Sequence, residues 1–204
     1  MGKTFREELV EQRWDDHRYY HHSMINQSLH FLSACTFLLC YALLFWDPAV
    51  ASLLAWTVAM WSRQSGHFFF EPKTYDNVNQ ATHAHKEEIK VGYNLFRKWV
   101  LMGIWAGLPI TLFFAPTFFG GFAAPAATWW EFARQTGWLW LWLGLGGLVF
   151  RVVQLMLTRG VQTGLAWGTK IITDPFNDFV TYRKSFGRLL RGEKYDHGLV
   201  IPAE

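Results

Sequence analysis

Four apolar stretches, separated by polar segments, constrain the fold of this chain more than any other feature. They cover residues 29–46, 49–61, 99–119 and 137–157. A helix needs roughly 20 predominantly apolar residues to cross a bilayer, and the second stretch falls short of that length. It crosses only if its helix continues through residues 66–70; otherwise it forms a re-entrant hairpin with the first stretch. The pattern predicts an all-α integral membrane bundle with about four transmembrane helices.

The composition supports a membrane protein that also carries sizeable polar segments. Hydrophobic residues make up 51% of the chain, and 12 of its 204 residues are Trp, a residue enriched at membrane–water interfaces. The mean hydropathy is nevertheless only +0.05, so polar segments must accompany the spans. We expect a single membrane domain over residues 1–204. It would contain an interfacial N-terminal helix within residues 1–27, the spans within 28–157 with a cytoplasmic histidine-containing loop at 62–98, and a cytoplasmic amphipathic tail at 158–204.

The distribution of lysine and arginine orients the spans. If all four stretches cross, nearly every Lys and Arg lies on the side of the N-terminus, whereas Arg134 lies on the other side. Cytoplasmic loops carry an excess of these residues, so we expect both termini to be cytoplasmic, in a bacterial-type inner membrane or an equivalent one. The net charge of +3 is small, and no nucleic-acid-binding motif accompanies it. The lipid bilayer, and not a nucleic acid, is therefore the expected partner.

The C-terminal tail admits two interpretations. Basic and apolar residues alternate over 182–191, which suits an amphipathic segment lying on an anionic leaflet. The same pattern suits a solvated helix packed on the cytoplasmic face of the bundle. The role of residues 173–204 therefore stays open on the sequence alone.

Histidines at the ends of the apolar stretches form the candidate functional site. His21 and His30 flank Asn26 at the start of the first stretch, and His67 precedes Glu71 by four residues after the second. Histidine is costly at membrane depth and is retained there mainly when it pairs or binds something. Imidazole is also the commonest neutral nitrogen ligand of metals. One such histidine alone would be expected to cap a helix end or bond a headgroup, but the set predicts a metal site.

A second pair of histidines lies in the polar loop. Asn79 is a suitable N-cap, and a helix that starts there places His85 on an apolar stripe with Ile89. His83 falls on a more polar face of the same helix. We therefore expect His85 to point inward as a further metal ligand and His83 to be solvated.

Two histidine motifs carry a resemblance to a known family. The pattern Tyr-His-His-x3-Asn-x3-His begins at Tyr20, and Gly-His-x3-Glu begins at Gly66. Together they resemble the small membrane proteins of the 2-hydroxy fatty acid dioxygenase family, which are iron(II)-dependent enzymes of fatty acid α-oxidation. The resemblance covers the first half of the chain, residues 14–73. After Glu71 the sequence departs from the family pattern, because the polar histidine-containing loop replaces a short link to the next span.

The resemblance implies a ligand set, a cofactor and an activity. His21, His30 and His67 would be metal ligands or essential neighbours, and the metal would be Fe(II). Asn26 and Glu71 would support them as catalytic residues. The activity implied is that of a membrane metal-dependent oxygenase acting on a fatty acyl or 2-hydroxy fatty acid substrate at the cytoplasmic membrane face. Neutral imidazoles leave coordination positions open for O2 and for the carboxylate and 2-hydroxyl of the substrate, and the cleavage would shorten the acyl chain by one carbon.

Two other functions stay open on the sequence alone. The chain could be a non-enzymatic accessory or assembly subunit of a larger membrane complex, in which its Trp residues serve helix contacts and its histidines hold a structural metal, a haem or a pigment. A homo-oligomer or a larger membrane complex is compatible with either the enzyme or the subunit. A di-iron lipid hydroxylase or desaturase is the third function, and it needs repeated histidine boxes. Residues 17–22 supply one such box and the others are missing, so we place this function last.

Overall fold

The fold is all-α, as the sequence predicts. The computed structural model describes residues 2–71, 74–76, 79–92 and 94–196. Within these residues there is no β-strand apart from two isolated bridges. The helices are α1 (Phe5–Tyr20), α2 (Met24–Leu43), α3 (Pro48–Leu54), the π-helical η1 (Ala55–Met60), α4 (Trp61–Phe69), α5 (His83–Ile89), α6 (Leu95–Phe114), α7 (Trp129–Arg159), α8 (Val161–Tyr182) and α9 (Ser185–Leu190).

Local sequence signals set where the first helices begin. Thr4 caps α1 in a capping box, because its hydroxyl accepts from the Glu7 backbone N–H while the Glu7 carboxylate accepts from the Thr4 backbone N–H. Asp47 caps α3 by accepting from the Val50 backbone N–H, and Pro48 occupies the first helical turn. The break between the first two apolar stretches therefore lies where the sequence predicts it.

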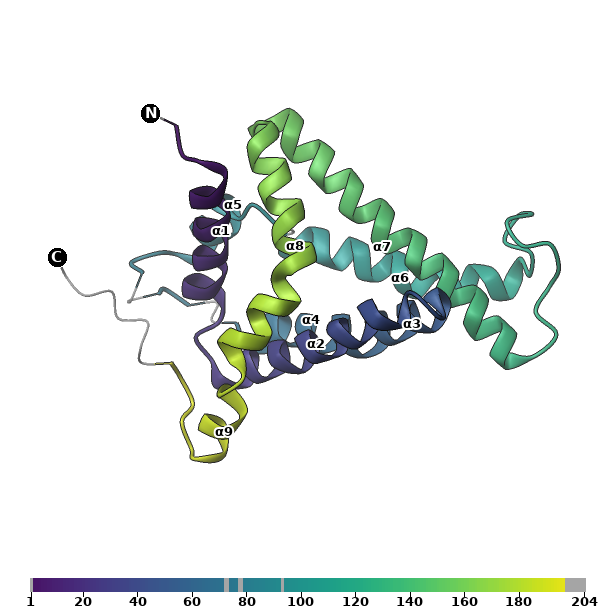
Figure 1. The fold of residues 1–204 in the computed structure, drawn as a ribbon, viewed down its shortest axis with the longest axis horizontal. Coiled ribbons are helices and arrows are strands. Elements are labelled where there is room, and N and C mark those ends of the chain that lie inside the picture. The colour runs from purple at the N-terminus through teal and green to yellow at the C-terminus, as the bar shows by residue number, and fades with distance from the viewer. Residues whose placement is uncertain (1, 72–73, 77–78, 93, 197–204) are drawn as a thin grey trace.

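Two helical segments, α2 and the run α3–η1–α4, pack side by side and return the chain to its starting end (Figure 1). The second run continues without interruption from Pro48 to Phe69, which is the continuity that the second apolar stretch needs in order to cross a membrane. The turn at residues 44–47 and the connection at 115–128 lie at one end of the molecule. Helices α1, α5 and α9 lie at the other end (Figure 1).

Three tryptophans join η1, α6 and α7 at the centre of the bundle. The ring centroids of Trp56 and Trp105 are 6.5 Å apart, and those of Trp105 and Trp140 are 5.2 Å apart. The Trp56 indole donates to the Trp140 carbonyl at 2.9 Å. Gly137 brings α7 against α3, because a Cβ at this position would lie 2.4 Å from the Ala49 carbonyl oxygen.

Helix α8 buries its polar face and exposes its apolar face. Four buried polar residues follow one another at intervals of four along one side of the helix: Lys170, Asp174, Asp178 and Tyr182. Large apolar residues on the other sides are exposed: Val161, Leu165, Ile172, Phe176 and Val180. Helix α8 packs on α1, α2 and α7, so residues 173–182 of the tail belong to a helix that contacts the bundle.

One helix of the described residues, α7, is long and apolar enough to cross a membrane. Only 11% of its apolar window is buried inside the molecule. The core helix of a soluble protein would be mostly buried, so α7 gives weak support to membrane association.

Candidate metal centre

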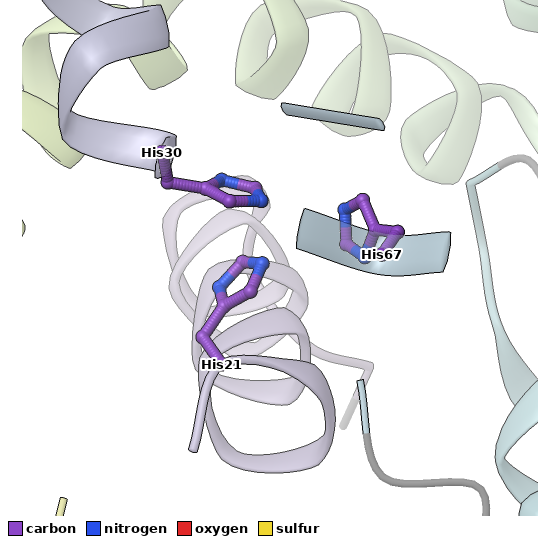
Figure 2. A group of neighbouring side chains, drawn as sticks. All are labelled: His21, His30 and His67. Carbon is purple, nitrogen blue, oxygen red and sulfur yellow. The ribbon is translucent and has the colours of Figure 1, made fainter. Parts of the chain in front are cut away.

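Three histidines that are distant in sequence converge at the end of the bundle where α1, α2 and α4 meet (Figure 2). His21 follows α1, His30 lies in α2 and His67 lies in α4, and all three are buried. One ligand nitrogen of each lies within 4.8 Å of those of the other two. The ring centroids of His21 and His30 are 4.0 Å apart. The ring centroid of His67 lies 5.4 Å from that of His21 and 5.0 Å from that of His30.

A break between α1 and α2 brings His21 to this cluster. His21 is the C-cap of α1, where its backbone N–H donates to the His17 carbonyl, and α2 begins only at Met24. His22 therefore does not share a helix face with His30, although the two are eight residues apart, because the chain turns between them. His22 instead faces the Asp76 carboxylate, with 3.8 Å between Nε2 and Oδ2.

The donor set fits a transition metal. Among the residues that the structure describes, both ring nitrogens of His30 and the Nε2 of His21 are buried without a hydrogen-bond partner, and leaving a buried polar group unsatisfied costs about 1–3 kcal/mol. Burial lowers the pKa of His21 well below its ordinary value, and the charge of His30 lowers it further. A neutral imidazole keeps a lone pair for coordination. The residues present thus meet the requirements of a nitrogen-ligated metal.

Glu71 lies directly behind His67. The Nδ1 of His67 is 2.8 Å from Oε2 of Glu71, so the ring donates to the carboxylate through Nδ1 and keeps Nε2 for another partner. A carboxylate behind a metal-binding histidine commonly fixes the orientation of the ring and raises its basicity. The structure places Glu71 as a partner of the predicted ligand His67.

Asn26 is fully buried between the cluster and the end of α1. Its amide nitrogen donates to the Tyr20 carbonyl at 2.7 Å, while its Oδ1 has no partner within the described residues. A Cβ on Gly66 would lie 2.1 Å from that Oδ1 and 3.5 Å from Cδ2 of His30. Gly66 therefore permits α4 to approach α2 closely enough for His67 to reach the cluster. Gly66 belongs to the second histidine motif, but the need for a glycine at this position becomes apparent only from the contact between α4 and α2.

Sequence reasoning missed three residues around the cluster, and two of them come from α8. The Tyr182 hydroxyl lies 2.7 Å from Nδ1 of His21. The Asp178 carboxylate lies 3.7 Å from Nδ1 of His30 and accepts from Arg63 at 2.9 Å. For the two residues of α8, the interval of four between polar residues in the sequence places them on one helix face, but it does not indicate that this face is buried.

The expectations for the second histidine pair are wrong. Helix α5 begins at His83 with Thr82 as its N-cap, so Asn79 does not start it. In this register Lys86 is the buried residue, His85 is exposed and His83 is half-buried. His85 does not belong to the cluster of three.

The first part of the chain is similar to a known protein family. Residues 8–81 match the family described as 2-hydroxy-palmitic acid dioxygenase Mpo1-like. The match confirms the resemblance carried by the two motifs, and it contains all three clustered histidines together with Asn26 and Glu71. It covers just over a third of the chain and ends before α5. Neither the curated proteins nor the solved structures gave a match.

Proposed function

We propose that this chain is a membrane-bound, iron(II)-dependent dioxygenase that acts on a fatty acyl or 2-hydroxy fatty acid substrate. The observation that carries the proposal is the convergence of His21, His30 and His67 inside the region that matches the dioxygenase family. The family alone supports a fatty acid dioxygenase-like activity. The cluster adds a place where the metal of such an enzyme can be held.

Each residue around the cluster has a separate task in this proposal. His21, His30 and His67 would hold the metal through ring nitrogens, and iron(II) bound there would supply the oxygen chemistry. Glu71 holds the ring of His67 in place through its 2.8 Å contact with Nδ1. The unpartnered Oδ1 of Asn26 offers an acceptor to the 2-hydroxyl of a substrate. Burial of all these groups keeps bulk water from the reacting atoms.

Lys98 supports an acid as the substrate. Its side chain is on α6 and only 8% exposed, yet its ammonium has no hydrogen bond or ion pair within the described residues. Phe68 of α4 stacks on Trp99 of α6 at 4.7 Å, so the residues next to them in sequence, His67 and Lys98, lie at the same helix contact. A substrate carboxylate would provide the partner that a buried ammonium requires.

The proposed substrate requires access from a membrane. We propose that α2, the run α3–η1–α4, α6 and α7 all cross the bilayer, with α1, α5 and α9 on the cytoplasmic side. The helices proposed to cross carry exposed large apolar side chains, which support this arrangement. Among these side chains are Leu32, Leu39, Ile104, Ile110, Val149 and Val153. The common end of α1, α5 and α9 (Figure 1) agrees with the one-sided distribution of Lys and Arg.

Metal analysis combined with product analysis tests the proposed function. The detergent-purified protein should contain stoichiometric iron and should convert 2-hydroxypalmitate, with O2, into an acid shorter by one carbon. His30→Ala should lose both the iron and the activity. His85→Ala is the matched control, because His85 is exposed and outside the cluster, and it should keep both. A protein without metal and without turnover that co-purifies with stable partners would instead support the accessory-subunit function.

A further inference from the structure

The polar face of α8 ends at Tyr182, beside the metal centre but far outside the family match. Tyr182 is 2% exposed. Its hydroxyl oxygen lies 2.7 Å from Nδ1 of His21 and 3.0 Å from Nδ1 of His17. Its ring meets the ring of His21 edge to face, with the centroids 5.5 Å apart. The hydroxyl is thus held between two imidazoles, only one of which belongs to the cluster.

A single hydroxyl proton allows two arrangements of these hydrogen bonds. In the first, the Tyr182 hydroxyl donates to His17, and Nδ1–H of His21 donates to the hydroxyl oxygen. The Nε2 of His21 then carries a lone pair. In the second, the hydroxyl donates to His21, whose own proton must sit on Nε2, where no acceptor lies within the described residues. Only the first arrangement gives the cluster a third nitrogen ligand.

The segment after α8 also fastens the backbone of His21. The Ser185 hydroxyl donates to Oε1 of Gln27 at 2.7 Å, and the Gln27 amide nitrogen donates to the His21 carbonyl at 2.8 Å. The same nitrogen lies 3.1 Å from the Asp196 carboxylate. The C-terminal part of the chain therefore contacts the His21 ring directly and is linked to the His21 carbonyl through the side chain of Gln27.

We infer that Tyr182 is a positioning residue of the metal centre: with His17 as its acceptor, it holds His21 in the tautomer that directs the Nε2 lone pair toward the metal. This inference rests on the proposed function, because it assumes that the three histidines bind a metal. It goes beyond the family match, since Tyr182 belongs to a helix that the match does not cover. Partners behind metal-binding histidines typically change metal affinity by about 10- to 100-fold when removed.

Cobalt(II) titration of the metal-free protein in detergent tests the inference without requiring activity. Tyr182→Phe keeps the ring and removes the hydroxyl, so we expect the Co(II) affinity to fall about 10- to 100-fold and the visible absorption spectrum of bound Co(II) to change. His17→Phe should shift affinity in the same direction, because the hydroxyl can then donate to His21. Tyr41→Phe is the matched control, since the Tyr41 hydroxyl also joins α2 to α8, at the Ile172 carbonyl, 2.8 Å away. It should keep the wild-type affinity and spectrum.

The outcomes separate this inference from the proposed function. Wild-type affinity and spectrum in Tyr182→Phe, with binding lost in His30→Ala, would overturn the role of Tyr182 and leave the metal centre intact. Equal losses in Tyr182→Phe and Tyr41→Phe would overturn it too, because they would reflect general packing of α2 on α8. If the wild-type chain binds no Co(II), the proposed function fails and the inference fails with it.

Discussion

At the scale of single residues, the geometry of the histidine cluster depends on a glycine, Gly66, which has no side chain. Gly66 precedes His67, and there is no room for a Cβ between its backbone and the buried amide of Asn26. Asn26 cannot retreat freely, because its nitrogen is bonded to the Tyr20 carbonyl. The position of α4 against α2, and with it the position of the His67 ring, is therefore set by the absence of one methyl group.

Gly66→Ala should damage the metal centre and destabilise the fold. The added Cβ must displace Asn26 or push α4 away from α2, and overpacking of this kind typically costs about 1–3 kcal/mol. We expect a lower thermal unfolding midpoint together with a loss of metal content, measured on the same preparation. Gly103→Ala in α6 is the control, because a Cβ there meets nothing within 4 Å. A Gly66→Ala protein with full metal content would show that the close approach is dispensable.

Lys98→Met should change which substrates are accepted and leave metal content unchanged. A hydrogen bond to a charged group is worth about 1.5–3 kcal/mol, so KM for a free 2-hydroxy acid should rise about 10- to 100-fold. The methyl ester of the same acid lacks the carboxylate charge and should be affected little. Arg97→Met removes an exposed neighbouring cation and should leave both KM values unchanged. An equal loss for acid and ester would argue against a carboxylate contact.

At the scale of elements, α8 shows how far the sequence can be interpreted. The apolar stretches locate α2, α6 and α7, and the motifs identify His21, His30 and His67, because both signals are local. The predicted start of α5 at Asn79 was wrong, because Thr82 is an equally competent N-cap. Tertiary contacts decide which of the two residues begins the helix. The polar residues of α8 could not be assigned to an inner face, because the same spacing serves a helix with its polar side in water. The residues of a helix alone do not determine whether a given face packs against protein, lipid or water.

An ion pair between elements, Asp16 of α1 with Lys170 of α8, should make stability depend on pH. The Lys170 ammonium contacts Asp16 at 2.5 Å and Asp174 at 2.7 Å. Burial, the largest single influence, would raise the pKa of Asp16, but the charges of Lys170 and Lys90 and the hydrogen bond from Lys170 together outweigh it and lower that pKa from 3.8 to about 2. A folded-state pKa below the ordinary value means that the carboxylate stabilises the fold above pH 3.8 and that this contribution is lost as the pH falls toward 2.

Asp16→Asn should therefore lower the thermal unfolding midpoint at neutral pH, and the difference from wild type should shrink as the pH is lowered from about 4 to 2. Glu11→Gln, which breaks an exposed pair with Lys3, should have little effect, because surface ion pairs contribute about 0–1 kcal/mol. A difference that stays constant across this acid range would mean that Asp16 acts through packing and not through its charge.

At the scale of the whole molecule, the two ends of the bundle differ in their chemistry. Helices α1 and α5 lie toward one end, and the opposite end holds the connection at 115–128 (Figure 1). At that far end Arg134 pairs with Asp47, so the lone arginine on this side of the chain is neutralised locally. The exposed apolar faces lie between the two ends, which is the arrangement expected of a bundle that crosses a membrane.

Cysteine labelling tests this orientation. In a chain with Cys35 and Cys40 replaced by Ala, a cysteine at Glu88 in α5 should react with a membrane-impermeant reagent only from the cytoplasmic side. A cysteine at Ala123, in the far connection, should react only from the other side. Both positions are exposed, so access to each is limited by the bilayer alone. Labelling of both from the same side would contradict the four-span arrangement.

The contact between His21 and Tyr182 also sets an order of events in the life of the chain. The two residues are separated by 161 positions, and a ribosome adding about 5–20 residues per second needs roughly ten to thirty seconds to make the intervening segment. Once residue 67 has been made, the nascent chain carries all three clustered histidines, but until residue 182 is added His21 lacks the hydroxyl that holds its ring. If the three histidines hold a metal as we propose, tight metal loading belongs to the end of synthesis, and we expect a chain truncated before residue 182 to carry the ligands but to hold the metal loosely.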